Sequence, residues 1–425
     1  MRRKLLTALL VAVAWCVGFA VVAAETTIVF WHWNREDRQA KLEPLIRRFE
    51  EETGIRVETQ MVPWEELPQK LVVSLAGGVA PDVTAISSDR GMALLLQGFY
   101  EDLGPFIAQE TDYDFDDLLP NALEMWQSDD GRQLAFPFDL DVLSLFYNPT
   151  LFDAAGIPYP DADLTWEETY DLAKRFTSDT DGDDRPDQFG FINGFMVWDT
   201  LVWSFGGELL DPTGTTHALG TTEARAGLEM WRNLSQDDVN LDWGMAPTYG
   251  YPTPTDAFGA GRVAMVPIGA WGPSAFWQDP ATGEFIVDFD VTYVPRSEQH
   301  ERGIPLAGQG LGMVAASEKK DAVWEFIKFM ASADVQEVSA RDLGQFPVLR
   351  SVAVSDAFMV PGQPPANMHT VIESTLYARF HPKHRNWPDA WSRMRTEVSR
   401  FVVGSASLSQ VLQTLDDVIP ALLSR

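Results

Sequence analysis

The sequence predicts an α/β protein made of two lobes, and three observations lead to this fold class. Over residues 26–86, short apolar runs alternate with amphipathic helical patterns, an order that produces a parallel sheet with helices on its faces. The apolar segment 136–148 has the length of two strands but is interrupted by two carboxylates. The chain of 425 residues is also long enough for two or more domains.

Segment 136–148 is expected to carry the chain from one lobe to the other. Its carboxylates, Asp139 and Asp141, share one side of an extended strand, because side chains alternate with a period of two. A buried carboxylate needs hydrogen-bond partners, so the strand either has internal donors here or opens into a wet cavity. We expect the second arrangement, with Asp141 facing a cleft between the lobes. A structural hydrogen bond is the alternative.

The other elements are placed from the periodicity of the apolar residues and from the residues that start or end helices and strands. In the first part we expect strand 26–31, helix 42–49, strand 57–61, helix 67–75 and strand 83–86. Thr165 and Glu168 form a capping box, which predicts the start of a further helix. Later strands are expected at 189–194, 263–267, 291–294 and 311–315, and later helices at 222–234, 323–330 and 408–422.

Residues 1–24 have the pattern of a secretory signal peptide. Arg2, Arg3 and Lys4 precede an apolar run, and small residues end at Ala24, which suits cleavage at that point. An uncleaved anchor is the alternative, because the apolar run is about long enough to span a membrane. We expect cleavage near Ala24 and an exported protein.

Composition excludes several classes of function. Cys16 is the only cysteine and lies in the predicted signal, so the mature chain has no disulfide, thiol nucleophile or cysteine metal site. The net charge is −30, and loss of the three basic groups of residues 1–24 leaves −33. This charge argues against nucleic acid and anionic membranes as partners. The 15 tryptophans are a high load for an acidic protein, and we expect some of them to line a surface.

Six segments in a fixed order carry a family resemblance. They are APD at 80–82, LFYNPTLF at 145–152, AGI at 155–157, TWEE at 165–168, FGAGRVAM at 258–265, which runs into Trp271, and EFIKFM at 325–330. In this order they resemble the extracellular solute-binding proteins of carbohydrate ABC importers, of the maltose- and oligosaccharide-binding type. The likeness covers nearly the whole mature chain.

The resemblance implies the two-lobed type II periplasmic-binding-protein fold, with mixed sheets joined by hinge strands. It also implies a monomeric periplasmic receptor that closes on a sugar and delivers it to the permease subunits of an importer. The implied parts are the signal 1–24, an N-terminal lobe of 25–138 and 296–346, and a C-terminal lobe of 139–295 and 347–425.

The resemblance also assigns roles to individual residues. Asp141 stands where the family's hinge strand carries a carboxylate that bonds sugar hydroxyls. Trp271 matches a stacking tryptophan, and Asp89-Arg90 matches a polar pair after the third strand. Binding a sugar needs such polar partners for hydroxyls and flat aromatics for the C–H faces. The candidate ligand-binding residues are Trp33, Asn34, Asp89, Arg90, Asp139, Asp141, Trp198, Trp203, Trp271 and Gln309.

For several of these residues a packing role is the alternative. Trp271 lies just past a strand end between glycines, which favours stacking over burial. Trp198 and Trp203 suit the core as well as a binding wall, and Asp89 with Arg90 suits a surface ion pair.

An acidic stretch is a candidate calcium loop with a structural role. Asp179, Asp181, Asp183 and Asp187 have the 1, 3, 5, 9 spacing of such loops. However, Gly182 stands at position four rather than six, and Gly190 replaces the bidentate glutamate. A solvated acidic turn is the alternative, and no other cofactor is expected.

An enzyme and a non-sugar receptor are the competing functions. Glycosidases use paired carboxylates beside aromatics, but Asp139 and Asp141 are nearly adjacent on one strand and could not easily flank a scissile bond. No nucleophile elbow, HExxH or P-loop occurs in the sequence. A receptor for peptides or polyamines would share the fold, but the aromatic load favours a sugar. We therefore expect a receptor and not an enzyme.

Overall fold

The computed structural model describes most of the chain after the predicted signal peptide. The described residues are 26–33, 36–63, 66–179, 182–193, 198–236, 239–279 and 281–424, without the side chains of 36–38, Asp89 and Arg90. Residues 1–24, Asn34 and Asp181 lie outside them. Within these ranges, no helix combines the length and apolar character needed to cross a bilayer.

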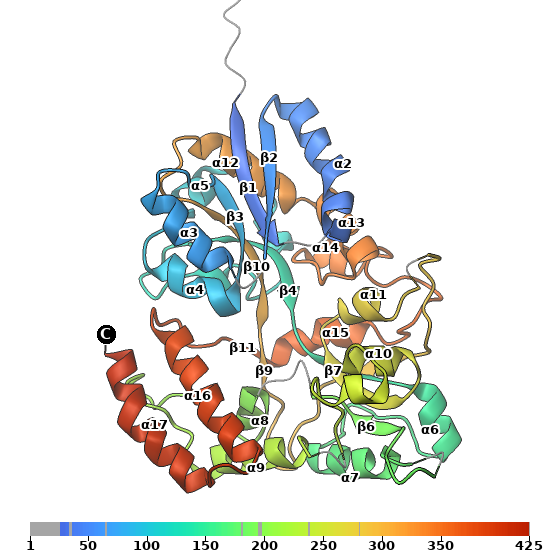
Figure 1. Cartoon of the computed structure of the whole chain (residues 1–425). Helices are drawn as coiled ribbons and strands as arrows, with labels where there is room; N and C mark the ends of the chain where they lie inside the picture. The colour runs from blue at the N-terminus through green and yellow to red at the C-terminus, as the bar shows by residue number, and fades with distance from the viewer. Residues whose placement is uncertain are drawn as a thin grey trace, which may run out of the picture.

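The first lobe is built on a five-stranded sheet of order β2-β1-β3-β10-β4. Its strands are β1 (Thr27–Trp33), β2 (Arg56–Val62), β3 (Val83–Ser87), β4 (Phe136–Asp141) and β10 (Ala307–Met313). β1 is parallel to β2 and β3, whereas β10 is antiparallel to both β3 and β4. The carboxyl ends of β1, β3 and β4 therefore share one edge of the sheet. This edge faces the second lobe (Figure 1).

Helices cover both faces of the first sheet (Figure 1). They are α2 (Glu36–Thr53), α3 (Leu67–Ala76), α4 (Ser88–Leu96), α5 (Gly104–Gln109), α12 (Lys320–Met330), α13 (Ala333–Leu343) and α14 (Arg350–Ala353), with the short helices η1 (Phe115–Asp117) and η2 (Glu124–Trp126). Phe326 of α12 packs edge-on against Phe30 and Phe49, with ring centroids 5.1 and 5.3 Å away. The expected alternation of strands and helices in 26–86 is confirmed.

The second lobe contains a four-stranded sheet of order β6-β7-β5-β8. Its strands are β5 (Ser144–Tyr147), β6 (Phe189–Phe191), β7 (Val263–Ile268) and β8 (Asp290–Thr292). Its helices are α6 (Pro149–Ala155), α7 (Trp166–Phe176), α8 (Trp198–Ser204), α9 (Thr222–Asn233), η3 (Ala246–Tyr249), α10 (Pro254–Gly259), α11 (Gly272–Phe276), α15 (His369–Ser374), η4 (Thr375–Tyr377), α16 (Trp387–Val402) and α17 (Leu408–Leu423). The capping box of Thr165 and Glu168 is confirmed at the start of α7.

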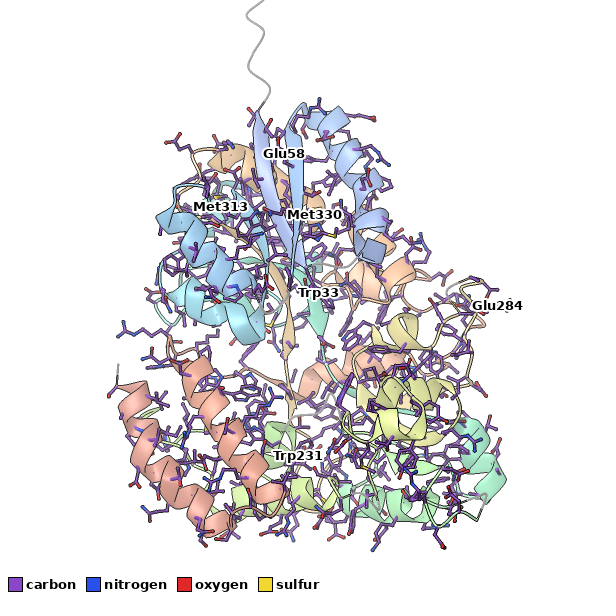
Figure 2. All side chains as sticks on the ribbon, in the orientation of Figure 1. Trp33, Glu58, Trp231, Glu284, Met313 and Met330 are labelled. Atoms are coloured by element: carbon purple, nitrogen blue, oxygen red, sulfur yellow. The ribbon has the colours of Figure 1, made fainter. Side chains whose placement is uncertain are left out.

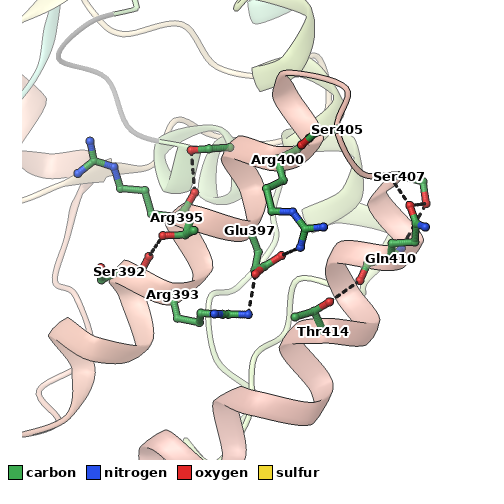
Figure 3. Close-up of polar contacts among 11 residues, drawn as sticks. Ser392, Arg393, Arg395, Glu397, Arg400, Ser405, Ser407, Gln410 and Thr414 are labelled. Atoms are coloured by element: carbon green, nitrogen blue, oxygen red, sulfur yellow. Dashed lines mark hydrogen bonds and ion pairs between the residues drawn. The ribbon is translucent and has the colours of Figure 1, made fainter.

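Helices α16 and α17 form a hairpin that closes the second lobe on one side (Figure 1). Glu397 of α16 is 2% exposed and lies 2.7 Å from Arg393 and 2.6 Å from Arg400 (Figure 3). A buried carboxylate requires such partners, so the two arginines allow Glu397 to lie within the hairpin. The N-terminal part of the hairpin reaches the first lobe, because α16 contacts α4.

The chain changes lobes at different positions from those implied by the resemblance. β4 remains in the first sheet through Asp141, and β5 begins only at Ser144, so the first crossing is at 142–143 rather than 138–139. The return leads through β9 (Ile304–Pro305) to β10, beyond the implied boundary at 296. β9 pairs with β11 (Ala378–Arg379) in a separate two-stranded sheet.

The third crossing also lies further along the chain than residue 347. The backbone N–H of Leu140 donates to Phe346 O at 3.0 Å, and that of Leu119 donates to Val348 O at 2.8 Å. These bonds keep 346–349 on the first lobe, where α14 packs on α13. The chain reaches the second lobe by α15, which packs on β8. Long-range backbone bonds of this kind leave no local signal in the sequence.

Candidate functional site

The strand directions bring the ends of both sheets together at the boundary between the lobes. In the second sheet, β7 is antiparallel to β5, with Ile268 opposite Ser144. The end of β7 therefore lies beside the beginning of β5. That edge joins the end of β4 through Val142 and Leu143. Side chains that follow β7 are thereby placed next to Asp141.

Asp141 and Trp271 meet at this point. The indole Nε1 of Trp271 donates to Oδ2 of Asp141 at 3.0 Å, and both residues are partly buried. Gly269 makes the approach possible, because a Cβ there would lie 2.1 Å from Asp141 Oδ1 and 2.4 Å from Trp271 Nε1. A hydrogen bond to an ionised carboxylate is stronger and more directional than a neutral one. The bond therefore fixes the plane of the Trp271 ring.

Asp139 has a different environment from Asp141. It is 6% exposed and accepts from the backbone N–H of Gln309 at 2.7 Å, from Gln309 Nε2 at 2.8 Å and from Gln345 Nε2 at 2.9 Å. The register of β4 and β10 shifts between Gln309 and Gly310, at the position of these bonds. The internal donors that were the alternative for this strand thus exist at Asp139. Asp139 and Gln309 hold β4 to β10, which is a structural use of their polar groups.

The predicted tryptophans of α8 belong to the interior of the second lobe. Trp198 is 2% and Trp203 is 4% exposed, and both pack in a cluster with α9, α16 and α17. Both side chains are buried by packing, and a role of either in ligand binding stays a prediction.

A buried polar residue that the sequence did not single out, Asp199, lies in the same helix as Trp198 and Trp203. Asp199 is fully buried, and its Oδ2 lies 2.7 Å from His381 Nε2 and 3.1 Å from Trp391 Nε1. A helix that is buried only by apolar contacts would need no aspartate, so the aspartate within 198–204 was the one sign in the sequence of a buried polar contact. Its partners are 182 and 192 residues away, so the sequence around Asp199 does not identify them.

The remaining candidates lie on the first lobe. Trp33 is partly buried at the end of β1, and Figure 2 shows it on the side of the first lobe that faces the second. Asp89 and Arg90 begin α4, directly after β3, but their side chains and Asn34 lie outside the described residues. The backbone positions of Asp89 and Arg90 therefore lie at the same edge of the first sheet as Asp141.

The acidic loop bonds to its own backbone. Asp179 accepts from Gly182 N at 2.6 Å and from Asp184 N at 2.8 Å, and Asp183 accepts from Arg185 N at 2.9 Å. Asp187 lies 3.8 Å from Arg262. In the described parts of the chain, which omit Asp181, no three His, Cys, Asp or Glu side chains are grouped as metal ligands.

Two surface cavities of the second lobe involve other residues. One of about 760 Å³ lies between the C-terminal ends of α9 and α16, and its lining includes Trp231 (Figure 2) and Asn193. The other, of about 630 Å³, is lined by 282–288, Gln363 and Pro364. Among the predicted ligand-binding residues whose side chains the structure describes, none lines either cavity.

Comparison with known proteins identifies the family to which the chain belongs. Residues 32–337 match the family model described as bacterial extracellular solute-binding protein. The diacetylchitobiose-binding protein DasA of Streptomyces coelicolor is 25% identical over 371 residues, which is 82% of each chain.

Solved structures share the fold. An ABC substrate-binding protein of Listeria monocytogenes in complex with cycloalternan superposes with a TM-score of 0.81 at 22% identity, over 94% of this chain and 99% of that one. Maltose-bound MalE3 of T. maritima superposes with a TM-score of 0.77 at 21% identity, over 94% and 100%. The expected two-lobed fold is thereby confirmed. The chain belongs to the bacterial extracellular solute-binding protein family, and is accordingly an exported binding protein and not an enzyme.

Proposed function

We propose that this protein binds a sugar or oligosaccharide between its two lobes and delivers it to the permease of an ABC importer. The observation that carries the proposal is the bond of Trp271 to Asp141 at the lobe boundary. It combines a flat aromatic ring with a carboxylate, the two groups that a sugar requires for its C–H faces and its hydroxyls. Similar proteins support this ligand class, since they include a diacetylchitobiose-binding protein and structures in complex with cycloalternan and with maltose.

The proposed mechanism is closure of the lobes around the ligand. Trp271 belongs to the second lobe, whereas Trp33 and the start of α4 belong to the first. A ligand that touches both sets gains its full contact energy only when the lobes are close. Its binding therefore shifts the population toward the closed state. The permease can then distinguish loaded from empty receptor by shape.

Three further features belong to the proposal. The signal peptide is cleaved near Ala24, the mature protein works in the periplasm, and it acts as a monomer. A structural calcium ion at 179–187 stays a prediction. Comparison of the melting temperature in calcium with that in a chelator tests it, and equal temperatures would contradict it.

The experiment is a titration of the intrinsic tryptophan fluorescence with single compounds. The probes are maltose, maltotriose, diacetylchitobiose, cellobiose, trehalose, ribitol, glutamate and spermidine, each repeated by thermal shift. We expect at least one sugar to change the fluorescence and raise the melting temperature with a Kd in the micromolar range or below. A response confined to glutamate or spermidine would instead show a receptor for a non-sugar solute.

A further inference from the structure

The starting point is the buried carboxylate of Asp199 at the beginning of α8. It has no exposed surface, and its Oδ2 is close to two ring nitrogens, His381 Nε2 at 2.7 Å and Trp391 Nε1 at 3.1 Å. Its Oδ1 accepts from the backbone N–H of Thr200 at 2.9 Å. An ionised carboxylate can only accept hydrogen bonds. The hydrogen of His381 must therefore be on Nε2.

This bond determines what the other nitrogen of His381 can do. In a neutral imidazole, one nitrogen donates and the other accepts. With the hydrogen on Nε2, Nδ1 presents a lone pair. Within the part of the chain that the structure describes, Nδ1 has no hydrogen-bond partner. The His381 side chain is 23% exposed, so its ring is within reach of a ligand.

Three indole rings surround the imidazole of His381. The centroids of Trp203, Trp387 and Trp391 lie 5.5, 5.8 and 6.1 Å from that of His381. Trp203 and Trp387 are buried, whereas Trp391 is partly exposed beside the histidine. The group thus offers one polar acceptor next to an aromatic surface. Two arginines contact these indole rings. Arg379 pairs with Glu208 at 2.8 Å and lies over Trp203 at 5.0 Å, and Arg395 lies over Trp391 at 5.5 Å.

The segment that contains His381 lies between the two lobes. β11, directly before it, pairs with β9 on the return of the chain to the first lobe. Two residues later, Lys383 Nζ donates to the carbonyl oxygen of Glu124 in the first lobe at 2.7 Å. The helix that follows, α16, contacts α4 of the first lobe. His381 therefore lies in a segment at the boundary between the two lobes.

We propose that His381 is a specificity-determining residue of the ligand site and that Asp199 is its positioning residue. Asp199 fixes the hydrogen on Nε2, and Nδ1 accepts a hydrogen bond from a ligand hydroxyl while Trp391 covers the adjacent C–H face. The site then selects neutral polyhydroxylated ligands. It disfavours carboxylated or phosphorylated sugars, whose charge would face the Nδ1 lone pair with Asp199 behind it. This inference rests on the proposed function and deepens it.

The test uses the full mature protein and isothermal titration with the neutral sugars and ribitol of the fluorescence panel. Galacturonate and glucose 6-phosphate serve as anionic probes. For the neutral probe that binds best, its series of monodeoxy derivatives is titrated against wild type, His381→Phe, Asp199→Asn and His369→Phe. His369 is an exposed histidine of α15 and serves as the matched control. Circular dichroism melting checks that each variant folds.

We expect His381→Phe to weaken the neutral ligand at least tenfold, with His369→Phe unchanged and the anionic probes bound at least tenfold more weakly than the neutral one. One monodeoxy derivative should bind wild type and His381→Phe equally, because it lacks the hydroxyl that Nδ1 accepts. Asp199→Asn should give the same derivative pattern. A ¹⁵N spectrum of labelled histidine should show the Nδ1 resonance of His381 moving on binding.

Two results would overturn the inference in different ways. In the first result, each deoxy derivative loses the same factor of affinity, relative to the parent sugar, in wild type and in His381→Phe, or His381→Phe binds the parent sugar like wild type. His381 then does not contact the ligand, although the sugar-receptor function stands. If wild type binds none of the neutral probes, the proposed function fails and this inference fails with it. Should Asp199→Asn not fold, the partly exposed His381 still decides the question.

Discussion

The indole Nε1 of Trp271 lies 3.0 Å from Oδ2 of Asp141, although 130 positions separate the two residues. The bond joins the last residue of β4, in the sheet of the first lobe, to the residue that precedes α11 in the second. It thus spans the boundary beside the first crossing of the chain. The orientation of the aromatic ring is coupled to the position of the first sheet.

Trp271 variants separate the contribution of the ring from that of its N–H. Trp271→Ala should weaken sugar binding by about 2–3 kcal/mol, since it removes the aromatic surface. Trp271→Phe keeps a ring but cannot donate to Asp141, and should lose about 1 kcal/mol. Titration calorimetry with the best-binding sugar measures both changes.

The matched control is Tyr159→Ala. Tyr159 is an aromatic residue, 47% exposed, that packs against Tyr147 at the opposite end of β5 from the crossing. Its loss should leave the affinity unchanged. Equal affinities of wild type and Trp271→Ala, both folded, would remove this residue from the ligand site.

Gly269→Ala should disrupt the same contact without removing either partner. The added methyl group would lie 2.1 Å from Asp141 Oδ1, so the carboxylate or the indole must move. We expect sugar affinity to fall at least tenfold, or about 1.4 kcal/mol, measured by fluorescence titration. Gly220→Ala is the control, because a Cβ there meets nothing within 4 Å. If Gly269→Ala binds as tightly as Gly220→Ala, the geometry at Asp141 does not matter for binding.

The sequence sufficed for the parts of this site that follow strand ends. Asp141 stood out as a carboxylate that interrupts an apolar strand and Trp271 as an aromatic residue just past a strand end, and both patterns are local; that the two residues bind a ligand stays a prediction. The architecture followed from the same patterns, since alternating strands and helices restrict the topology. The capping box at Thr165 shows how far such local signals reach, because both of its hydrogen bonds exist.

The parts that could not be predicted depend on contacts between distant segments. Asp139 looked equivalent to Asp141, but Gln309 and Gln345, separated from it by 170 and 206 residues, supply its donors. No local pattern marks His381, because its partner Asp199 is 182 residues away. A buried polar residue in a single sequence reveals that partners are needed, but it does not name them.

Glu110 should make the stability of the first lobe depend on acid pH. Its carboxylate lies 2.6 Å from Lys328 Nζ, 3.1 Å from Trp324 Nε1 and 2.8 Å from the backbone N of Asp112. The hydrogen bond to Lys328 lowers its pKa from 4.5 to about 2. The unfolded chain therefore takes up the proton first as the pH falls. The stabilisation is complete above pH 4.5 and disappears as the pH approaches about 2.

Glu110→Gln should accordingly cost about 2–3 kcal/mol near neutral pH, and the difference from wild type should shrink as the pH falls below 4.5. Urea unfolding at pH 7, 4.5 and 3.5 measures it. Glu43→Gln is the control, because Glu43 and its partner Arg47 are 55% and 56% exposed and such pairs contribute little. A difference for Glu110→Gln that is constant over this range would contradict the linkage.

His217 should give a second pH dependence, at milder acidity, in the second lobe. Its side chain is 2% exposed, Nε2 lies 3.0 Å from Oδ1 of Asp416 on α17, and Nδ1 accepts from the backbone N–H of Leu219 at 3.2 Å. Burial lowers the pKa of His217 below its ordinary 6.5, against the opposing effect of Asp416. As the pH falls, His217 is protonated first in the unfolded chain. The contribution of the neutral imidazole to stability is therefore complete above pH 6.5 and falls as the pH drops through the folded pKa.

In wild type this loss should reach a slope of up to about 1.4 kcal/mol per pH unit, measured by urea unfolding between pH 7.5 and 5. His217→Gln removes the titrating group, and its unfolding free energy should change less over the same range, even if it is lower throughout. His369→Gln, at an exposed position on α15, should keep the slope of wild type. If His217→Gln and wild type lose stability in parallel, the proton taken up between these pH values belongs to another group, and the packing of α17 against the 210–220 loop does not depend on a neutral imidazole.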